Sequence, residues 1–332
     1  MVQHLFPALV PQLALVDASS IALAFGFAES SLIALRLQFQ IGPVSPGFDL
    51  VEGRFYEAIL DMYLCDIHSH TKLSPDSEAE LLDNARAAVA AGLREFCVTD
   101  HCDLLGLDGL PVTSFDWPAA KAQYYAVKPQ VDGQLVFRLG LELGSAPYDP
   151  AAARDILAQG GEELDFVLGS MHNWIGMEGG QDLAFSNYRD DLALSRRAVE
   201  STLDHTWTLV TQCPDCYDSL AHIVYPLRYI HRDGVELSIG DYEDRVRAIF
   251  TEVAKTDHAM EVNVCRGNDL DSWPPLLAWF RECGGRLVTV GADAHRPEDV
   301  AKGVPEALDM LKAAGFGHVT TYERRKPVLH KL

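Results

Sequence analysis

Tyr63-Leu-Cys-Asp-Ile-His-Ser-His70 is the stretch that decides the fold, because an apolar run typical of a strand leads directly into two histidines with one residue between them. Side-chain direction alternates along a strand, so His68 and His70 point to the same side of a sheet. Imidazole is a common ligand of transition metals, and Asp66 is placed to act as a further ligand or to support one. The pattern raises the hypothesis of a metal site, although an isolated pair of this kind is more often two half-exposed polar side chains.

Alternating strands and helices follow this first strand. The predicted strands cover residues 63–67, 95–99, 135–141, 166–170, 219–221, 259–264 and 286–290. The predicted helices cover residues 78–91, 117–127, 151–159, 191–213, 242–256, 274–283 and 297–314. A capping box at Ser77-x-x-Glu80 is expected to begin the first helix, and Gly92 is expected to end it. Such alternation indicates parallel strands joined by right-handed crossovers.

Every predicted strand ends near a residue that can bind a metal ion. In chain order these residues are His68 and His70, His101, Glu142, His172, His222, Glu261 or Asn263, and Asp293 with His295. In an open doubly wound sheet they would be spread along one edge, whereas the strand ends of a closed barrel surround a single mouth. We therefore predict an α/β fold of the TIM-like barrel type rather than a flavodoxin-like sheet.

Composition restricts the possible partners. The 332-residue chain has a formal net charge of -21, from 27 Lys and Arg against 48 Asp and Glu. This charge opposes non-specific binding to nucleic acid and to anionic membranes, so we expect neither as a partner. Seven cysteines without disulfide-scaffold spacing indicate a reducing compartment, and we expect a cytoplasmic protein. We interpret the Cys213-Pro-Asp-Cys216 pair as incidental.

Residues 1–61 differ from the rest of the chain. They are rich in Leu, Ala, Val and Phe, and the first basic side chain other than histidine is Arg36, so they lack the basic start of a secretory signal. Asp17, Glu29 and several prolines interrupt any membrane-spanning run. We predict that residues 1–61 are an appendage outside the fold or the result of a mis-assigned start, and that residues 62–332 form one barrel.

The histidines and carboxylates point to metal-dependent hydrolysis. Six histidines with Asp76, Glu142 and Asp293 exceed the three or four ligands of one zinc site. If they converge, they would hold two or three divalent ions, and a mixed nitrogen and oxygen set without cysteine suits Zn, Mn or Fe. Closely spaced ions generate a bridging hydroxide near neutral pH and stabilise an in-line displacement, which is the chemistry of phosphoester hydrolysis.

These motifs, in this order, resemble those of the PHP (polymerase and histidinol phosphatase) superfamily: His68-Ser-His70, Thr99-Asp-His101, Glu142, Ser170-Met-His172, His222 and Asp293-Ala-His295. The resemblance covers about 62–320, and the text at 66–77, 165–172, 221–226 and 261–263 is similar to its stand-alone histidinol-phosphate phosphatases. It implies a distorted (β/α)7 barrel with a trinuclear site. One ion would be held by His68, His70, Glu142 and Asp293, a second by bridging Glu142 with His172 and His222, and a third by Asp76, His101 and His295.

The resemblance also implies a reaction: hydrolysis of L-histidinol phosphate in histidine biosynthesis, by attack of a metal-bridging hydroxide. A phosphate ester entering an acidic protein requires arginine nearby, and we predict Arg266 first and Arg228 second as phosphate ligands. Trp174, Phe185 and Tyr188 are candidates for an imidazole pocket, or equally for packing of a lid.

Other functions remain open from the sequence. A PHP phosphoesterase for a nucleotide or another small phosphate ester would have the same ligands and a different pocket. A nuclease acting on long nucleic acid is disfavoured because no basic stripe offsets the acidity. An amidohydrolase would normally have a bridging lysine at a strand end, and a non-catalytic metal-binding barrel would be expected to have lost ligands. Metal identity and oligomeric state are not specified by the sequence.

Overall fold

The computed structural model describes residues 62–175 and 180–332, and the following statements concern those residues. The predicted appendage, residues 1–61, lies outside them. Within the described residues, every helix is too short or too polar to span a membrane.

A parallel sheet forms the centre of the fold. Its strands are β1 (Cys65–Asp66), β2 (Glu95–Val98), β4 (Val136–Gly144), β5 (Phe166–Ser170), β6 (Ser219–Leu220), β7 (Ala259–Asn263) and β8 (Val288–Gly291), which pair in that order. The short strand β3 (His101–Asp103) pairs with the second half of β4, after β2 has paired with the first half. β2 and β3 therefore act as one strand interrupted at Thr99 and Asp100.

Backbone contacts between the first and last strands close the sheet into a barrel. The amide of Ile67 donates to the carbonyl of Val290 (3.1 Å), and the amide of Asp293 donates to the carbonyl of His68 (3.0 Å). Ser69 and Ala294 form a parallel bridge further along the same seam. The TIM-like (β/α)7 barrel expected from the sequence is confirmed.

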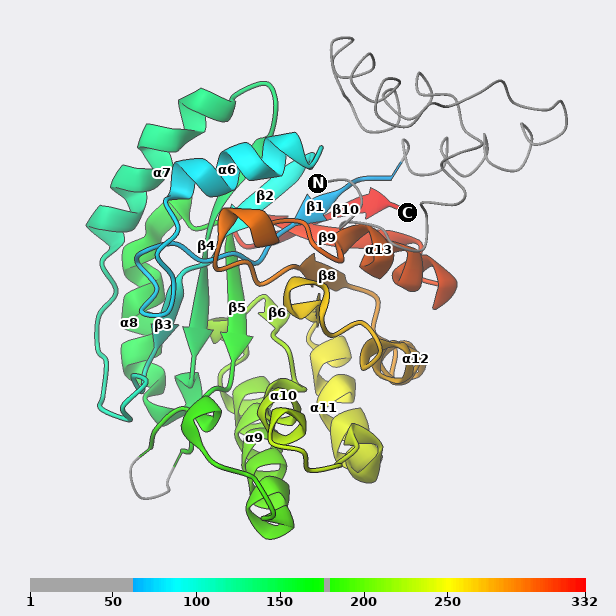
Figure 1. Ribbon diagram of the computed structural model, residues 1–332. Helices are drawn as coiled ribbons and strands as arrows, with labels where there is room; N and C mark the ends of the chain where they lie inside the picture. The colour runs from blue at the N-terminus through cyan, green and yellow to red at the C-terminus, as the bar shows by residue number, and fades with distance from the viewer. Residues whose placement is uncertain (1–61, 176–179) are drawn as a thin grey trace, which may run out of the picture. The chain divides into compact units, whose positions relative to one another are not determined.

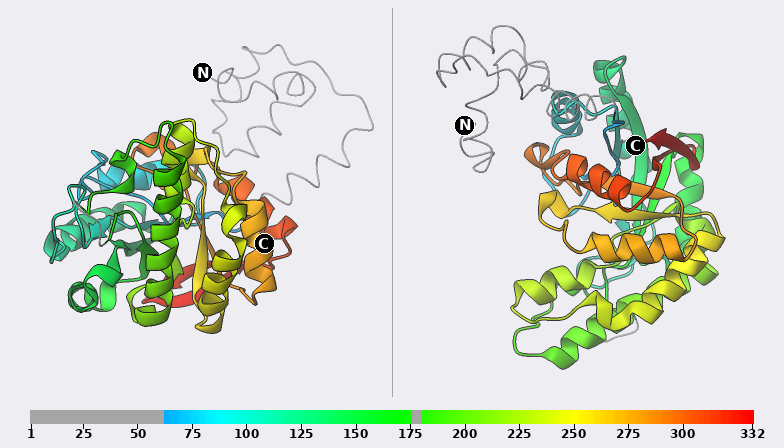
Figure 2. Two further views of the ribbon diagram at one scale, coloured as in Figure 1. Left: turned by 90° about the horizontal axis from the view of Figure 1, so that it is seen from below. Right: turned by 90° about the vertical axis from the view of Figure 1, so that its right-hand side faces the viewer.

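Helices surround the strands on the outer side of the barrel (Figures 1 and 2). They are α6 (Leu81–Ala90), α7 (Trp117–Val131), α8 (Pro150–Gly160), α9 (Leu192–Gln212), α10 (Tyr225–Arg232), α11 (Glu243–Lys255), α12 (Trp273–Glu282) and α13 (Val304–Ala313). Because helices cover one face and the barrel interior covers the other, every residue of β2, β5, β7 and β8 is buried. The short helix α10 was not predicted from the sequence.

A C-terminal hairpin closes the amino-terminal end of the barrel. Its strands, β9 (His318–Glu323) and β10 (Lys326–Lys331), pair antiparallel and were not predicted. The hydroxyl of Tyr322 donates to the carbonyl of Asp218 (3.0 Å), immediately before β6. The hydroxyl of Thr321 donates to Glu95 (3.1 Å), the first residue of β2. The opposite end, where the strands terminate, is therefore the end left for a site.

The helix predicted over 117–127 extends to Val131, and two helix boundaries beside the strand ends also differ from the prediction. The expected capping box does not form: α6 begins only at Leu81, and the Ser77 hydroxyl accepts from the Ala79 amide (3.2 Å) and donates to the His295 carbonyl (2.9 Å). The last predicted helix is divided, because a short 3-10 turn at Pro297–Asp299 is followed by Gly303 at φ +77°, and α13 starts after it. Both changes shape the loops beside the strand ends.

Candidate metal centre

The predicted metal ligands meet at the carboxyl-terminal end of the barrel. His68 and His70 follow β1, His101 begins β3, Glu142 lies in β4, and the remaining donors follow β5, β6 and β8, with Asp76 on the loop before α6. A cavity of about 1170 Å³ opens above them, lined by seven of these side chains: Asp76, His101, Glu142, His172, His222, Asp293 and His295. His68 and His70 are fully buried. Residues separated by more than 200 positions thus share one site.

The first donor group consists of His68, His70, Glu142 and Asp293. The Nε2 atoms of His68 and His70 are 3.0 Å apart, and they lie 3.0 and 3.4 Å from Oε2 of Glu142. The Oδ1 atom of Asp293 is 3.7 Å from Nε2 of His68 and 3.2 Å from Nε2 of His70. Ligands of a tetrahedral zinc ion at ordinary bond lengths are separated by about 3.3 Å. The spacing of this group matches the edges of such a coordination shell.

Hydrogen bonding fixes the tautomers of the first two histidines. Nδ1 of His68 lies 2.5 Å from Oε1 of Glu261, and because a carboxylate only accepts, this nitrogen carries the proton. Nδ1 of His70 donates to the Ser74 hydroxyl (3.1 Å), whose own proton goes to Asp100 (2.7 Å). Both Nε2 atoms therefore present lone pairs to one another, an arrangement that a shared cation stabilises.

The second donor group repeats this arrangement. Nδ1 of His172 donates to Oδ1 of Asp103 (2.8 Å), and Nδ1 of His222 donates to Oε2 of Glu261 (3.0 Å). Their Nε2 atoms are 2.9 Å apart, and each lies 3.3 Å from Oε1 of Glu142. This oxygen is buried and accepts no hydrogen bond from the described residues. One carboxylate oxygen of Glu142 faces each donor group, which is the geometry of a bridging ligand.

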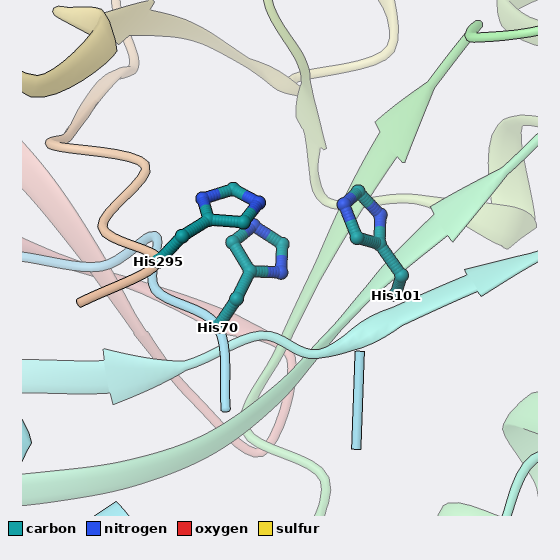
Figure 3. A group of neighbouring side chains, drawn as sticks. All are labelled: His70, His101 and His295. Carbon is teal, nitrogen blue, oxygen red and sulfur yellow. The ribbon is translucent and has the colours of Figure 1, made fainter. Parts of the chain in front are cut away.

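The third group is more open. Nε2 of His295 lies 2.9 Å from Oδ2 of Asp76, and Nε2 of His101 lies 3.7 Å from the same oxygen. The side chain of Asp76 is 41% exposed. Figure 3 shows His70 with these two histidines, and its ring centroid is 4.3 Å from each of theirs. The third group thus adjoins the first, because His70 of the first group forms a candidate metal cluster with His101 and His295.

The electrostatics favour a cation at each position. Burial and the neighbouring His101 and His295 lower the pKa of His70 to about 3, which keeps that imidazole neutral and able to ligate. Burial alone would lower the pKa of His172, but the carboxylates of Asp103 and Glu142 outweigh it and raise this pKa to about 10. Burial opposes charge on Glu142 as well, yet the adjacent histidines hold its pKa well below the usual range. Protons and metal ions therefore compete for the same donors.

Supporting residues were only partly visible in the sequence. Glu261, named there as a metal-capable residue at a strand end, contacts the Nδ1 atoms of His68 and His222, and these three residues also form a candidate metal cluster. Asp103, which was missed, contacts His172 and lies 3.3 Å from Nδ1 of His101. The signal that could have found Asp103 is its position two residues after His101, on the same face of a strand.

Asp66 is not a ligand. Its Oδ1 accepts from the amides of His68 (3.4 Å) and Ala292 (2.9 Å), and its Oδ2 accepts from the amide of Ala301 (2.9 Å). The carboxylate therefore ties the end of β1, including the His68 backbone, to the loop after β8, which fits the supporting role offered from the sequence rather than that of a ligand.

Both predicted phosphate ligands line the cavity. Arg228, on α10, donates from Nη2 to Asn263 (2.7 Å) and from Nη1 to Asp293 (3.3 Å), while its buried Nε has no hydrogen-bond partner among the described residues. Arg266 follows β7, and its amide donates to the carbonyl of Ala292 (2.7 Å) at φ +58°. The structure therefore brings both arginines to the same cavity as the metal donors.

The aromatic residues proposed for a pocket do not line this cavity. Trp174 is buried and donates from Nε1 to the Ser186 hydroxyl (2.8 Å), and Tyr188 is buried and donates to the Leu183 carbonyl (3.0 Å). Phe185 is 62% exposed. Of the two interpretations offered from the sequence, packing describes Trp174 and Tyr188. The rings that do line the cavity belong to Tyr225 and Tyr229 of α10.

The barrel and its donor set define a metal-binding α/β barrel. The PHP domain model matches residues 66–264, and the chain belongs to the PHP domain family. The chain is similar to the histidinol-phosphatase of Lactococcus lactis, with 24% identity over 266 residues that cover 79% of this chain and 95% of that protein. It is 28% identical over 289 residues to the "probable histidinol-phosphatase" of Deinococcus radiodurans, covering 79% and 98%.

A solved structure supports the fold. The crystal structure of histidinol phosphate phosphatase from Lactococcus lactis, complexed with Zn, L-histidinol and phosphate, matches with a TM-score of 0.66 and 21% identity. The match covers 80% of this chain and 99% of that one. At this level of identity the likeness shows that the two chains share the barrel fold.

Proposed function

We propose that this chain is a metal-dependent phosphomonoesterase that hydrolyses L-histidinol phosphate to L-histidinol and phosphate. The observation that carries the proposal is the position of Glu142, which faces a donor group with each carboxylate oxygen at the base of a cavity that also holds Arg228 and Arg266. The relatives described above are named for this activity and match over nearly their whole length.

The three donor groups would hold two or three divalent ions. The donors are imidazole nitrogens and carboxylate oxygens without thiolate, which suits Zn, Mn or Fe. When bound, such ions lower the pKa of a coordinated water and neutralise charge on a phosphoryl group. The Lactococcus lactis structure was solved with Zn, which favours zinc among the candidates.

The side chains of this protein have separable tasks. Glu261 and Asp103 keep the Nδ1 protons in place, so that the Nε2 atoms of the histidines stay available as ligands. Arg228 and Arg266 would bind the phosphate oxygens, because a guanidinium presents several N–H groups in a planar fork. The Nε of Arg228 makes no hydrogen bond within the described residues, although it lies 3.7 Å from Oδ2 of Asp269. Charge developing on the phosphoryl oxygens would then be stabilised by groups already in position.

Comparison of substrates tests this proposal. We expect kcat/KM for L-histidinol phosphate to exceed that for phenyl phosphate and nucleoside monophosphates by at least about tenfold, equivalent to ~1.4 kcal/mol of transition-state stabilisation. The control variant Glu142→Gln should lose activity toward every ester, since it weakens both donor groups. Equal rates across the panel would contradict the assignment of L-histidinol phosphate and leave a general small-molecule phosphatase. No turnover of any ester by metal-loaded protein would contradict the reaction itself.

A further inference from the structure

One buried carboxylate in the cavity has no role in the metal centre. Asp182 lines the cavity with a relative exposure of 5%, immediately before a short 3-10 turn at Leu183–Phe185. Its Oδ1 accepts from the amide of Ala184 (2.7 Å) and from the Tyr225 hydroxyl (2.9 Å). Within the described residues, its Oδ2 accepts only from the same hydroxyl, at 3.1 Å. The carboxylate is therefore held in one orientation.

Asp182 makes no direct ion pair within the described residues, although the imidazole of His172 acts electrostatically on its charge. Among residues 62–175 and 180–332, no lysine, arginine or histidine forms an ion pair with it, in contrast to the carboxylates of the metal centre. A buried charged group without a partner is costly unless a ligand completes its environment. Capping of the 3-10 turn explains one oxygen, and an asparagine or serine would serve that purpose without charge. The turn therefore does not explain the negative charge of Asp182, which has no direct ion-pair partner in the described residues.

Tyr225 connects Asp182 to the second donor group. Its ring centroid is 4.5 Å from that of His172 and 5.6 Å from that of His222, while its hydroxyl donates to Asp182. Tyr225, Tyr229 and Leu107 also line this part of the cavity. Asp182 is thus one side chain away from the predicted ligands, beside surfaces suited to a flat or apolar group. If the phosphate group of a substrate lies at the metal centre, the organic part of the ester can reach Asp182 and the side chains beside it.

We propose that Asp182 determines specificity by receiving a positively charged group of the substrate, an ammonium or an imidazolium, while the phosphate lies at the metal centre. The inference rests on the proposed function, since L-histidinol phosphate carries both an amine and an imidazole. A carboxylate fixed by a tyrosine and a backbone amide is pre-organised for such a cation, and the aromatic rings beside it can contact the ring or the hydrocarbon stem.

The test is the variant Asp182→Asn. Its amide oxygen still accepts from Ala184 and Tyr225, so the variant removes charge with little change in shape. We expect KM for L-histidinol phosphate to rise by about 10- to 100-fold, the range for loss of a hydrogen bond to a charged group. The kcat/KM for phenyl phosphate, which has no cation, should stay within about twofold of wild type because the phosphate contacts are retained. Glu298→Gln is the matched control, because Glu298 is an exposed acid of the same cavity, and it should change neither value.

Two analogues identify the cation. Phenylalaninol phosphate keeps the ammonium and lacks the imidazole, and 3-(imidazol-4-yl)propyl phosphate has the reverse pattern. Only the analogue whose cation meets Asp182 should lose affinity in Asp182→Asn. The inference is overturned if the variant keeps its preference for L-histidinol phosphate, or if both L-histidinol phosphate and phenyl phosphate lose equally, which would indicate a structural role. If wild type itself does not prefer L-histidinol phosphate, the proposed function fails together with the inference. Metal content and thermal unfolding of each variant establish that it is folded.

Discussion

Glu261 is the residue on which the two best-defined donor groups jointly depend. Its Oε1 lies 2.5 Å from Nδ1 of His68 and its Oε2 lies 3.0 Å from Nδ1 of His222. In the variant Glu261→Gln the amide offers one acceptor oxygen and one NH₂ donor, so only one of the two Nδ1–H groups finds an acceptor. The other imidazole must place its proton on Nε2, where it can no longer bind metal.

The expected loss of metal affinity follows from the number of Nδ1–H groups left without an acceptor. Loss of one supporting partner of a metal-bound histidine typically lowers metal affinity about 10- to 100-fold, or ~1.4 to 2.7 kcal/mol. Glu261→Gln should therefore weaken one donor group by that amount. Glu261→Ala affects both groups and should reach about 10²- to 10⁴-fold if the two losses add. Activity should fall with the metal content and recover partly when excess metal is supplied.

The assay is metal analysis after dialysis against graded concentrations of chelator, with kcat/KM measured on the same samples. Glu95→Gln is the matched control, because Glu95 is also 1% exposed but lies at the other end of the barrel, bonded to Arg138 and Thr321. This control should lose stability without losing metal. If Glu261→Gln retains as much metal as wild type and its kcat/KM is within about twofold of the wild-type value, the assignment of His68 and His222 as ligands positioned by this carboxylate is refuted.

Three other predictions follow from named contacts. Arg228→Ala, assayed at saturating metal because Arg228 also bonds to Asp293, should lower kcat/KM about 10- to 100-fold. Arg228→Lys should restore only part of the loss because it lacks the planar fork, and unchanged initial rates would exclude a phosphate contact. Metal-free protein should release protons on binding zinc at neutral pH, since Asp103 and Glu142 outweigh burial and raise the pKa of His172 to about 10; affinity should then rise with pH, and titration heats that do not depend on the buffer would contradict this. Gly291→Ala should lower the thermal midpoint by an amount equivalent to about 1 to 3 kcal/mol because its Cβ would overlap that of His68, and an unchanged midpoint would show that the barrel seam can relax.

The sequence predicted the barrel and the convergence of the donors because both follow from local rules. Parallel strands place their ends at one mouth, and His68, His101 and Asp293 lie at or just beyond strand ends, so their meeting could be inferred without coordinates. The role of a residue could not be inferred where it depends on contacts with a segment far away in the sequence. The carboxylate of Asp66 accepts from backbone amides that include those of Ala292 and Ala301, more than 200 positions along the chain.

The missed features share a physical cause. Arg228 was predicted near the phosphate, but the helix that carries it, α10, is only eight residues long and gives little periodic signal. The charge of Asp182 appears unusual only once its burial is known, and its partner Tyr225 lies more than 40 positions away. Trp174 was a candidate pocket residue because the sequence does not show which aromatic rings are buried in the core, as that of Trp174 is. The roles of these residues depend on burial and on contacts between distant parts of the chain, which the sequence alone does not show.

Anomalous diffraction from crystals of the zinc-loaded protein tests the central claim most directly, because it locates ions without reference to activity. We predict one peak among His68, His70, Glu142 and Asp293, a second among Glu142, His172 and His222, and, at full loading, a third beside Asp76, His101 and His295. Fewer than two peaks, or peaks away from Glu142, would contradict the proposed metal centre.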